Sequence, residues 1–208
     1  MIKLLIYDLD GTLLPMREIH FQSLNRALEK IAGKEFVIWR ETHEKRFDGI
    51  PTAVKLNILT EEYGLPKNLH GAISREKQRT TIEIIKEEIS HEPGLVSTFK
   101  NLRRDGYITA CFTNSVFETA RVSLEQCGLY TILDTVLAND QILYPKPNPQ
   151  GYLQIMTKYG IGPRQTVIFE DNFNGIRAGF LSGANVVVVR DPSELTEEFI
   201  RKGISLYE

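Results

Sequence analysis

The chain alternates short apolar runs with stretches of helical spacing, and this alternation restricts its fold more than any other feature. The apolar runs are rich in β-branched and aromatic residues and lie at 3–7, 107–112, 135–138, 166–169 and 185–189. Helical patterns lie near 95–104, 116–127, 149–159, 173–182 and 193–202. Strands that alternate with helices predict an α/β protein with a doubly wound, Rossmann-like parallel sheet. The run "VVVV" at 186–189 is typical of a strand buried on both faces.

One long segment breaks this alternation, because it contains helical patterns and no convincing strand. Its helical stretches are expected at 18–32, 51–63 and 67–90. We therefore expect a helical domain at residues 16–91, here called the insert. The α/β core would then consist of residues 1–15 and 92–208.

Composition excludes several classes of protein. The 208 residues carry a formal net charge of −2 and no long basic run, which disfavours binding to nucleic acid or a membrane surface. No apolar segment approaches the roughly 20 residues of a membrane span, and acidic residues interrupt the first apolar stretch, unlike in a signal peptide. Cys111 and Cys127 make no disulfide framework, so we expect them in the hydrophobic core of a cytoplasmic protein. We also expect a monomer, because the predicted packing faces use most apolar residues.

Two aspartates end the first apolar run, in the sequence "DLDGT". Ligands of open α/β sheets bind at the carboxyl ends of the strands, which is where Asp8 and Asp10 would lie. Two carboxylates in one place repel each other unless a cation or a shared proton intervenes. Magnesium suits them, because it prefers carboxylate oxygens and often bridges to phosphate. The alternative is a pair of ordinary turn or capping aspartates.

The later strands also end in polar residues. "TNS" at 113–115 offers donors for phosphate oxygens, or caps for the next helix. Lys146 stands among three prolines that stiffen its loop. Glu170 and Asp171 would either cap the following helix or complete a metal site. Together these strand ends indicate a site for a phosphoryl group and a divalent metal.

These motifs resemble those of the haloacid dehalogenase superfamily of phosphotransferases. "DLDGT", "TNS", "KPNPQGY" and "EDNFNGIRAGFLSGA" resemble its four motifs, in order and over nearly the whole chain. The insert resembles the small helical cap of the subgroup that includes β-phosphoglucomutase and phosphoglycolate phosphatase. A haloacid dehalogenase itself would need no magnesium, so the adjacent acids Glu170 and Asp171 argue against that chemistry.

The resemblance implies a role for each acid. Asp8 would be the nucleophile that forms an aspartyl-phosphate, and Asp10 the general acid and then the general base. Asp8, the backbone carbonyl of Asp10 and Asp171 would bind Mg²⁺, with Glu170 helping directly or through a water molecule. Asp10 must be protonated in the first step, so a raised pKa of this group would help.

The resemblance also implies roles for polar and basic residues. Thr113 and Asn114 would hold phosphate oxygens, and Lys146 would neutralise Asp8 and the phosphoryl group. His20 would link the hinge of the insert to Asp10, unless it is simply a helix-packing histidine. Thr52 stands where β-phosphoglucomutase has an arginine that grips a second phosphate.

The expected function is therefore a magnesium-dependent phosphatase acting on a small phosphorylated metabolite. Arg46 or Lys55 could replace the arginine that β-phosphoglucomutase has at the position of Thr52, although charged residues on amphipathic helices are usually just solvated. A phosphosugar mutase and a phosphate-sensing protein without turnover are the other readings of these motifs. A dinucleotide site is disfavoured, because "DGTLLP" and not "GxGxxG" follows the first strand.

Overall fold

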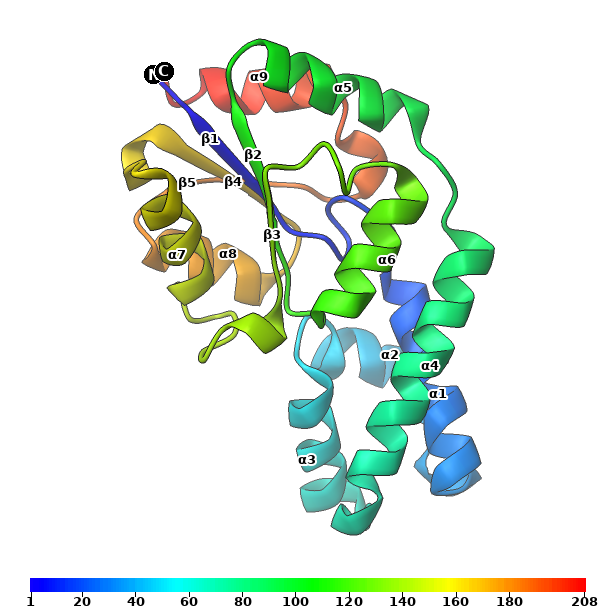
Figure 1. Cartoon of the computed structure of the whole chain (residues 1–208). Helices are drawn as coiled ribbons and strands as arrows, with labels where there is room; N and C mark the ends of the chain where they lie inside the picture. Colours follow the sequence, from blue (N-terminus) through cyan, green and yellow to red (C-terminus); the bar gives the residue numbers. More distant parts are fainter.

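A five-stranded parallel sheet forms the centre of the protein, in a computed structural model that describes residues 1–208 (Figure 1). The strand order is β3-β2-β1-β4-β5. The strands are β1 (Leu4–Tyr7), β2 (Ile108–Phe112), β3 (Thr135–Leu137), β4 (Thr166–Glu170) and β5 (Asn185–Val188). The predicted α/β class with a doubly wound, Rossmann-like sheet is confirmed.

Helices cover both faces of this sheet. One face packs against α5, α6 and α9, and the other against α7 and α8. These helices are α5 (Pro93–Arg104), α6 (Phe117–Cys127), α7 (Gln150–Tyr159), α8 (Phe173–Leu181) and α9 (Glu197–Ser205). Helix α9 begins later than the sequence pattern suggested, because the Thr196 side chain caps it by accepting a hydrogen bond from the backbone N–H of Phe199.

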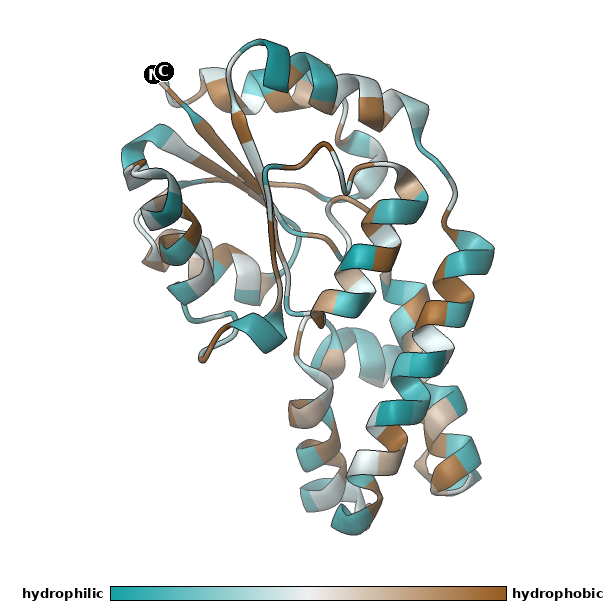
Figure 2. Cartoon of the chain, in the orientation of Figure 1, coloured by the Kyte–Doolittle hydropathy of each residue, from teal (hydrophilic) through white to brown (hydrophobic).

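Neighbouring residues of each inner strand pack into different hydrophobic clusters. In β1, Leu5 and Tyr7 join the cluster beneath α5, α6 and α9, whereas Leu4 and Ile6 join the cluster beneath α7 and α8. This follows from the alternation of side chains along a strand, and it explains why the inner strands are mainly apolar on both faces. Figure 2 shows the hydrophobic colour along β1 and mixed colours on the surrounding helices.

The expectation for the valine run was wrong. Strand β5 lies at the edge of the sheet, so Val188 is 48% exposed and only the Val186 side chain is buried within this strand. An apolar run reports β propensity and partial burial, but it does not encode the place of a strand in the sheet order. Cys111 and Cys127 are fully buried and reduced, as predicted.

The insert is helical and lies beyond the end of β1, at the lower right of Figure 1. Its helices are α1 (Arg17–Ile31), α2 (Arg40–Thr42), α3 (Thr52–Tyr63) and α4 (His70–Glu88). A π-helical turn, His43–Phe47, follows α2 and had no counterpart in the sequence prediction.

The insert has a hydrophobic cluster of its own, which includes Leu28, Phe47 and Leu56. Ile84 and Ile85, near the end of α4, belong instead to the larger cluster of the core. The end of α4 thus packs with the core, so the hydrophobic packing gives no sharp boundary there. The division into a core of residues 1–15 and 92–208 and an insert of residues 16–91 stays a prediction. No helix of the chain combines the length and apolar character that crossing a bilayer requires.

Candidate functional site

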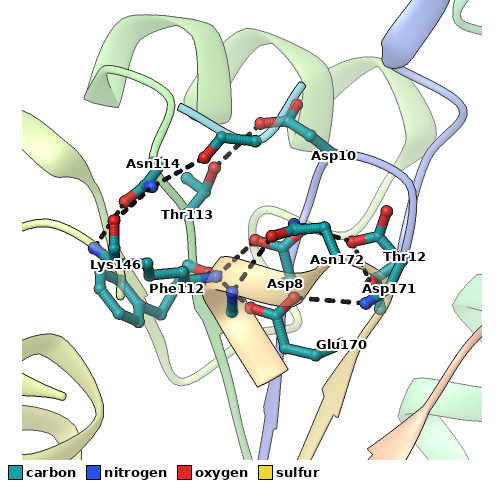
Figure 3. Close-up of polar contacts among 12 residues, drawn as sticks. Asp8, Asp10, Thr12, Phe112, Thr113, Asn114, Lys146, Glu170, Asp171 and Asn172 are labelled. Carbon is teal, nitrogen blue, oxygen red and sulfur yellow. Dashed lines mark hydrogen bonds and ion pairs between the residues drawn. The ribbon is translucent and has the colours of Figure 1, made fainter. Parts of the chain in front are cut away.

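The register of the sheet brings the polar strand ends together. Leu4 of β1 pairs with Ile108 of β2 and with Thr166 of β4, so these three strands run level with one another. Their carboxyl ends therefore meet at one edge, where β1 leads into Asp8 and β4 ends at Glu170. Figure 3 shows the side chains that converge there.

Lys146 is the buried cation of this edge, with 3% of its surface exposed. Its Nζ lies 2.6 Å from Asp8 Oδ1, donates to the Phe112 carbonyl at 2.8 Å and also donates to Glu170 Oε1. Burial alone would lower the pKa of Lys146, but the charges of Asp8 and Glu170 raise it well above the ordinary value. Lys146 is therefore a fixed positive charge between two buried carboxylates. The Tyr152 hydroxyl donates to Glu170 Oε1 at 2.5 Å.

Asp8, Glu170 and Asp171, here called the acid cluster, offer carboxylate oxygens that lie within 4.8 Å of one another. Asp8 Oδ2 is buried and has no hydrogen-bond partner. Burial and the charge of Glu170 raise the pKa of Asp8 well above its usual value, although Lys146 opposes this. An unpartnered carboxylate oxygen and an excess of negative charge fit a hard divalent cation with oxygen ligands. The residues present thus suit Mg²⁺.

Arg17 brings a second cation to the acid cluster from the start of α1. Its guanidinium forms an ion pair with Asp171 and a second, at 3.2 Å, with Asp48 of the insert. Gly11 makes room for these contacts: it has φ +102°, and a Cβ there would lie 2.2 Å from Asp171 Oδ2. The sequence analysis did not single out Arg17, because an exposed arginine at a helix start carries no local signal of its partners.

Asp10 has partners different from those of Asp8. It accepts hydrogen bonds from His20 Nε2 at 3.0 Å, from Ser115 Oγ at 2.7 Å and from Thr113 Oγ1 at 3.1 Å. Burial raises the pKa of Asp10, but His20 and the two hydroxyls together lower it below the ordinary value. The raised pKa that would help a general acid is therefore absent from this arrangement, because three donors stabilise the ionised carboxylate.

His20 connects Asp10 to the far side of the insert. Its Nδ1 lies 3.3 Å from Nζ of Lys77 in α4. Burial and the charge of Lys77 lower the pKa of His20, although Asp10 opposes this. A neutral imidazole that accepts from Lys77 at Nδ1 and donates to Asp10 at Nε2 satisfies both contacts. Lys77 was missed from sequence, because 57 residues separate it from His20.

Thr113 and Asn114 lie beside the acids, and both already have protein partners. Thr113 Oγ1 donates to Asp10 and accepts from the backbone N–H of Ser115 at 2.9 Å. The Asn114 amide donates to the carbonyl of Gly49 in the insert at 3.0 Å and to that of Lys146 at 3.2 Å. Their role in holding phosphate stays a prediction.

A cavity of about 320 Å³ lies between the insert and the core, next to Asp10. Polar side chains dominate its lining, with few hydrophobic residues. Asn114 and Ser115 line it from the core, and Lys55 and Lys77 line it from α3 and α4. A small polar molecule in this cavity would lie within reach of Asp10.

Comparison with known proteins gives the same family as the motifs. The family of haloacid dehalogenase-like hydrolases matches residues 5–189. A phosphorylated carbohydrates phosphatase of Thermotoga maritima is 26% identical over 181 residues, which cover 86% of this chain and 80% of the relative. A fructose-1-phosphate phosphatase of Escherichia coli is 29% identical over 188 residues, 89% of this chain and 95% of the relative.

A solved structure shares the fold over its full length. The β-phosphoglucomutase of Clostridium difficile superposes with a TM-score of 0.83 at 19% identity, covering 100% of this chain and 99% of that one. The match with the family extends from β1 to the residue after β5, and so includes the whole of the acid cluster, Lys146 and the insert. The chain belongs to the family of haloacid dehalogenase-like hydrolases.

Proposed function

We propose that the chain is a magnesium-dependent phosphatase that hydrolyses a small phosphomonoester through an aspartyl-phosphate intermediate. The observation that carries this proposal is the convergence on Asp8. Lys146 Nζ lies 2.6 Å from one of its oxygens, and the other oxygen is buried and unpartnered. Carboxylate oxygens of Asp8, Glu170 and Asp171 lie within 4.8 Å of one another. The names of the Thermotoga maritima and Escherichia coli relatives, both phosphatases of phosphorylated sugars, support the same reaction class.

Asp8 acts as the nucleophile in the first step. Its carboxylate attacks the phosphorus atom, the bond from phosphorus to the leaving oxygen breaks, and that oxygen takes a proton from Asp10. Lys146 reduces the repulsion between the carboxylate and the phosphoryl oxygens, which is the main electrostatic obstacle to this reaction. The products are an alcohol and an aspartyl-phosphate, so the transfer is divided into two easier steps.

Asp10 must gain a proton before that step, because the ionised form is favoured in the free protein. Lys77 and His20 provide a route: a proton passes from Lys77 Nζ to His20 Nδ1, while His20 Nε2 gives its own proton to Asp10. Burial lowers the pKa of Lys77 to about 7, which makes this ammonium a stronger acid than an ordinary lysine. In the second step the ionised Asp10 accepts a proton from the water that attacks phosphorus, which releases inorganic phosphate and Asp8.

Magnesium held by the acid cluster would supply positive charge against the phosphoryl oxygens and orient them toward Asp8. The cavity next to Asp10 favours a small metabolite over a phosphoprotein, because the insert covers it and its volume is about 320 Å³.

Hydrolysis of p-nitrophenyl phosphate tests the proposal. We expect turnover that requires Mg²⁺, is abolished by EDTA, and falls at least about a thousandfold in Asp8→Asn, which removes the nucleophilic charge at nearly constant shape. Asp105→Asn, a substitution at an exposed aspartate of the α/β core domain, serves as the matched control and should keep the wild-type rate. An Asp8→Asn variant with wild-type turnover would exclude the proposed nucleophile. A complete lack of turnover on phosphomonoesters would favour a phosphate-sensing protein.

A phosphosugar mutase is the second candidate, and the His20–Asp10 contact of 3.0 Å favours it. The resemblance to the mutase subgroup fails at Thr52, where that subgroup carries the arginine for a second phosphate. Product analysis with a sugar phosphate separates the two functions. Released inorganic phosphate supports the phosphatase, and an isomerised sugar phosphate supports the mutase.

A further inference from the structure

The side chain of Asn114, just after β2, already has a partner for each of its amide protons. Its Oδ1 accepts a hydrogen bond from the backbone N–H of Lys146 at 3.0 Å, and its Nδ2 donates to the carbonyl of Lys146 at 3.2 Å (Figure 3). The same Nδ2 donates to the carbonyl of Gly49 in the insert at 3.0 Å. An amide NH2 group has two protons, so no donor of Asn114 is left for a phosphate oxygen.

The two bonds with Lys146 hold the backbone from which the buried cation extends. Lys146 stands between Pro145 and Pro147, which have no N–H to donate. Its own N–H and carbonyl both pair with Asn114. A lysine side chain has a flexible four-carbon stem, so a fixed backbone is needed to keep Nζ at 2.6 Å from Asp8. Asn114 therefore supports the position of the cation.

The third bond of Asn114 reaches the insert at Gly49. Gly49 has φ +70°, and a Cβ on it would lie 3.0 Å from Cγ of Asn172. Asn172 caps α8 by accepting from the backbone N–H of Gly175 at 3.1 Å, and it donates to Asp171 Oδ1 at 3.2 Å. Only glycine combines this backbone conformation with so close an approach. The insert thus docks on the core beside two asparagines that are both bonded to residues of the candidate site.

We propose that Asn114 is a positioning residue that couples docking of the insert at Gly49 to the placement of Lys146 beside Asp8. One side chain makes both contacts, so a movement of the insert away from the core removes a partner of Asn114 and frees its amide to rotate. The backbone of Lys146 then loses part of its support. The cation is therefore held most firmly when the insert is docked. The effect on turnover rests on the proposed function, whereas the coupling itself is a property of the protein without substrate.

Proton exchange of the Lys146 backbone N–H, followed by NMR without substrate, tests the coupling. Gly49→Ala disturbs the docking contact and leaves the Asn114 side chain intact. It should speed this exchange at least about threefold, which is the order of effect of loosening one hydrogen bond. Gly64→Ala is the matched control, because Gly64 also lies in the insert with a positive φ, +75°, but a Cβ on it would meet no atom within 4 Å. It should leave the exchange of Lys146 unchanged.

A double variant shows whether the coupling passes through Asn114. Asn114→Ala should speed the exchange of the Lys146 N–H by itself, and adding Gly49→Ala to it should bring no further increase. Unchanged exchange in Gly49→Ala would overturn the proposal. An effect of Gly49→Ala that is equally large with and without the Asn114 amide would overturn it as well.

Steady-state kinetics with p-nitrophenyl phosphate distinguish positioning of Lys146 from direct binding of phosphate. A displaced cation stabilises the transition state less, so Asn114→Ala should lower kcat at least about tenfold and change KM less than about threefold. A tenfold rise in KM at an unchanged kcat would assign Asn114 to phosphate and overturn the proposal.

The exchange and kinetic measurements together separate this inference from the proposed function. Coupled exchange at Lys146 in a protein without turnover would uphold the role of Asn114 and reject the phosphatase. Turnover without coupled exchange would reject the role of Asn114 and uphold the phosphatase.

Discussion

Replacing Lys146 by methionine should destabilise the protein strongly. The side chain is 3% exposed and contacts Asp8, Glu170 and the Phe112 carbonyl, so methionine would leave two buried carboxylates without their cation. Removing one partner of a buried ion pair typically costs about 3–5 kcal/mol, a large share of the roughly 5–15 kcal/mol that stabilises a domain. For a chain of this length, this corresponds to a fall in Tm of about 6–20 °C.

The destabilisation should depend on pH in a defined direction. Burial already raises the folded-state pKa values of Asp8 and Glu170 above their ordinary values, and Lys146 opposes this for both groups. Without Lys146 these pKa values rise further. A carboxyl group whose pKa is higher in the folded state binds more protons there, so its effect is to lower stability as the pH rises above about 4. The loss in free energy of unfolding that Lys146→Met causes should therefore be larger at pH 8 than at pH 5.

Calorimetric unfolding of wild type and Lys146→Met at both pH values measures this. Lys100→Met, at an exposed lysine of α5, removes a charge without a buried partner and should change Tm little. If Lys146→Met lowers the free energy of unfolding by less than about 1 kcal/mol, or if this loss shrinks as the pH rises, Lys146 is not the cation that compensates these buried acids.

Three further outcomes are expected. Burial and the charge of Lys55 lower the pKa of His43 to about 3, so the free energy of unfolding should fall by up to about 1.4 kcal/mol per pH unit below pH 6.5. Urea unfolding at pH 7 and pH 5 should show a weaker pH dependence in His43→Leu than in the wild type. The same pH dependence in both proteins would contradict the role of His43. Gly175→Ala would place a Cβ 1.9 Å from Glu170 Oε1 and should cost about 1–3 kcal/mol by urea unfolding, whereas Gly94→Ala, with no atom within 4 Å, should be tolerated. Magnesium at about one hundred times its Kd should stabilise the folded protein by about 2.7 kcal/mol, with EDTA reversing the shift in Tm; an unchanged Tm would speak against a metal at the acid cluster.

Most of the fold could be predicted from sequence, because its signals are local. Each inner strand consists mainly of apolar residues. Each strand end that carries chemistry is marked by residues that a buried strand would avoid, as Asp8 and Glu170 show. The rule that parallel strands end at one edge then brings residues together that lie far apart in the chain. Lys146 and Asp8 are 138 positions apart, and their contact follows from that rule together with the stiff proline loop.

Contacts between the insert and the core could not be predicted in this way. They depend on how the insert is oriented over the sheet, and no local pattern encodes that orientation. Lys77 and Lys55 look like ordinary charges of amphipathic helices, and only the packed structure shows that both line the cavity next to Asp10. The lowered pKa of Asp10 has the same origin, because its causes include His20 of the insert.

The double ion pair of Arg17 has a consequence for how the two parts of the molecule respond to one another. The guanidinium joins an acid of the insert, Asp48, to a member of the acid cluster, Asp171. A divalent ion bound at Asp171 would compete with Arg17 for this carboxylate, so binding of the ion and the ion pair of Arg17 with Asp171 oppose each other. Loss of the Arg17 guanidinium should therefore tighten binding of the ion, which makes the affinity for the ion adjustable through one side chain that takes no part in the proposed chemistry.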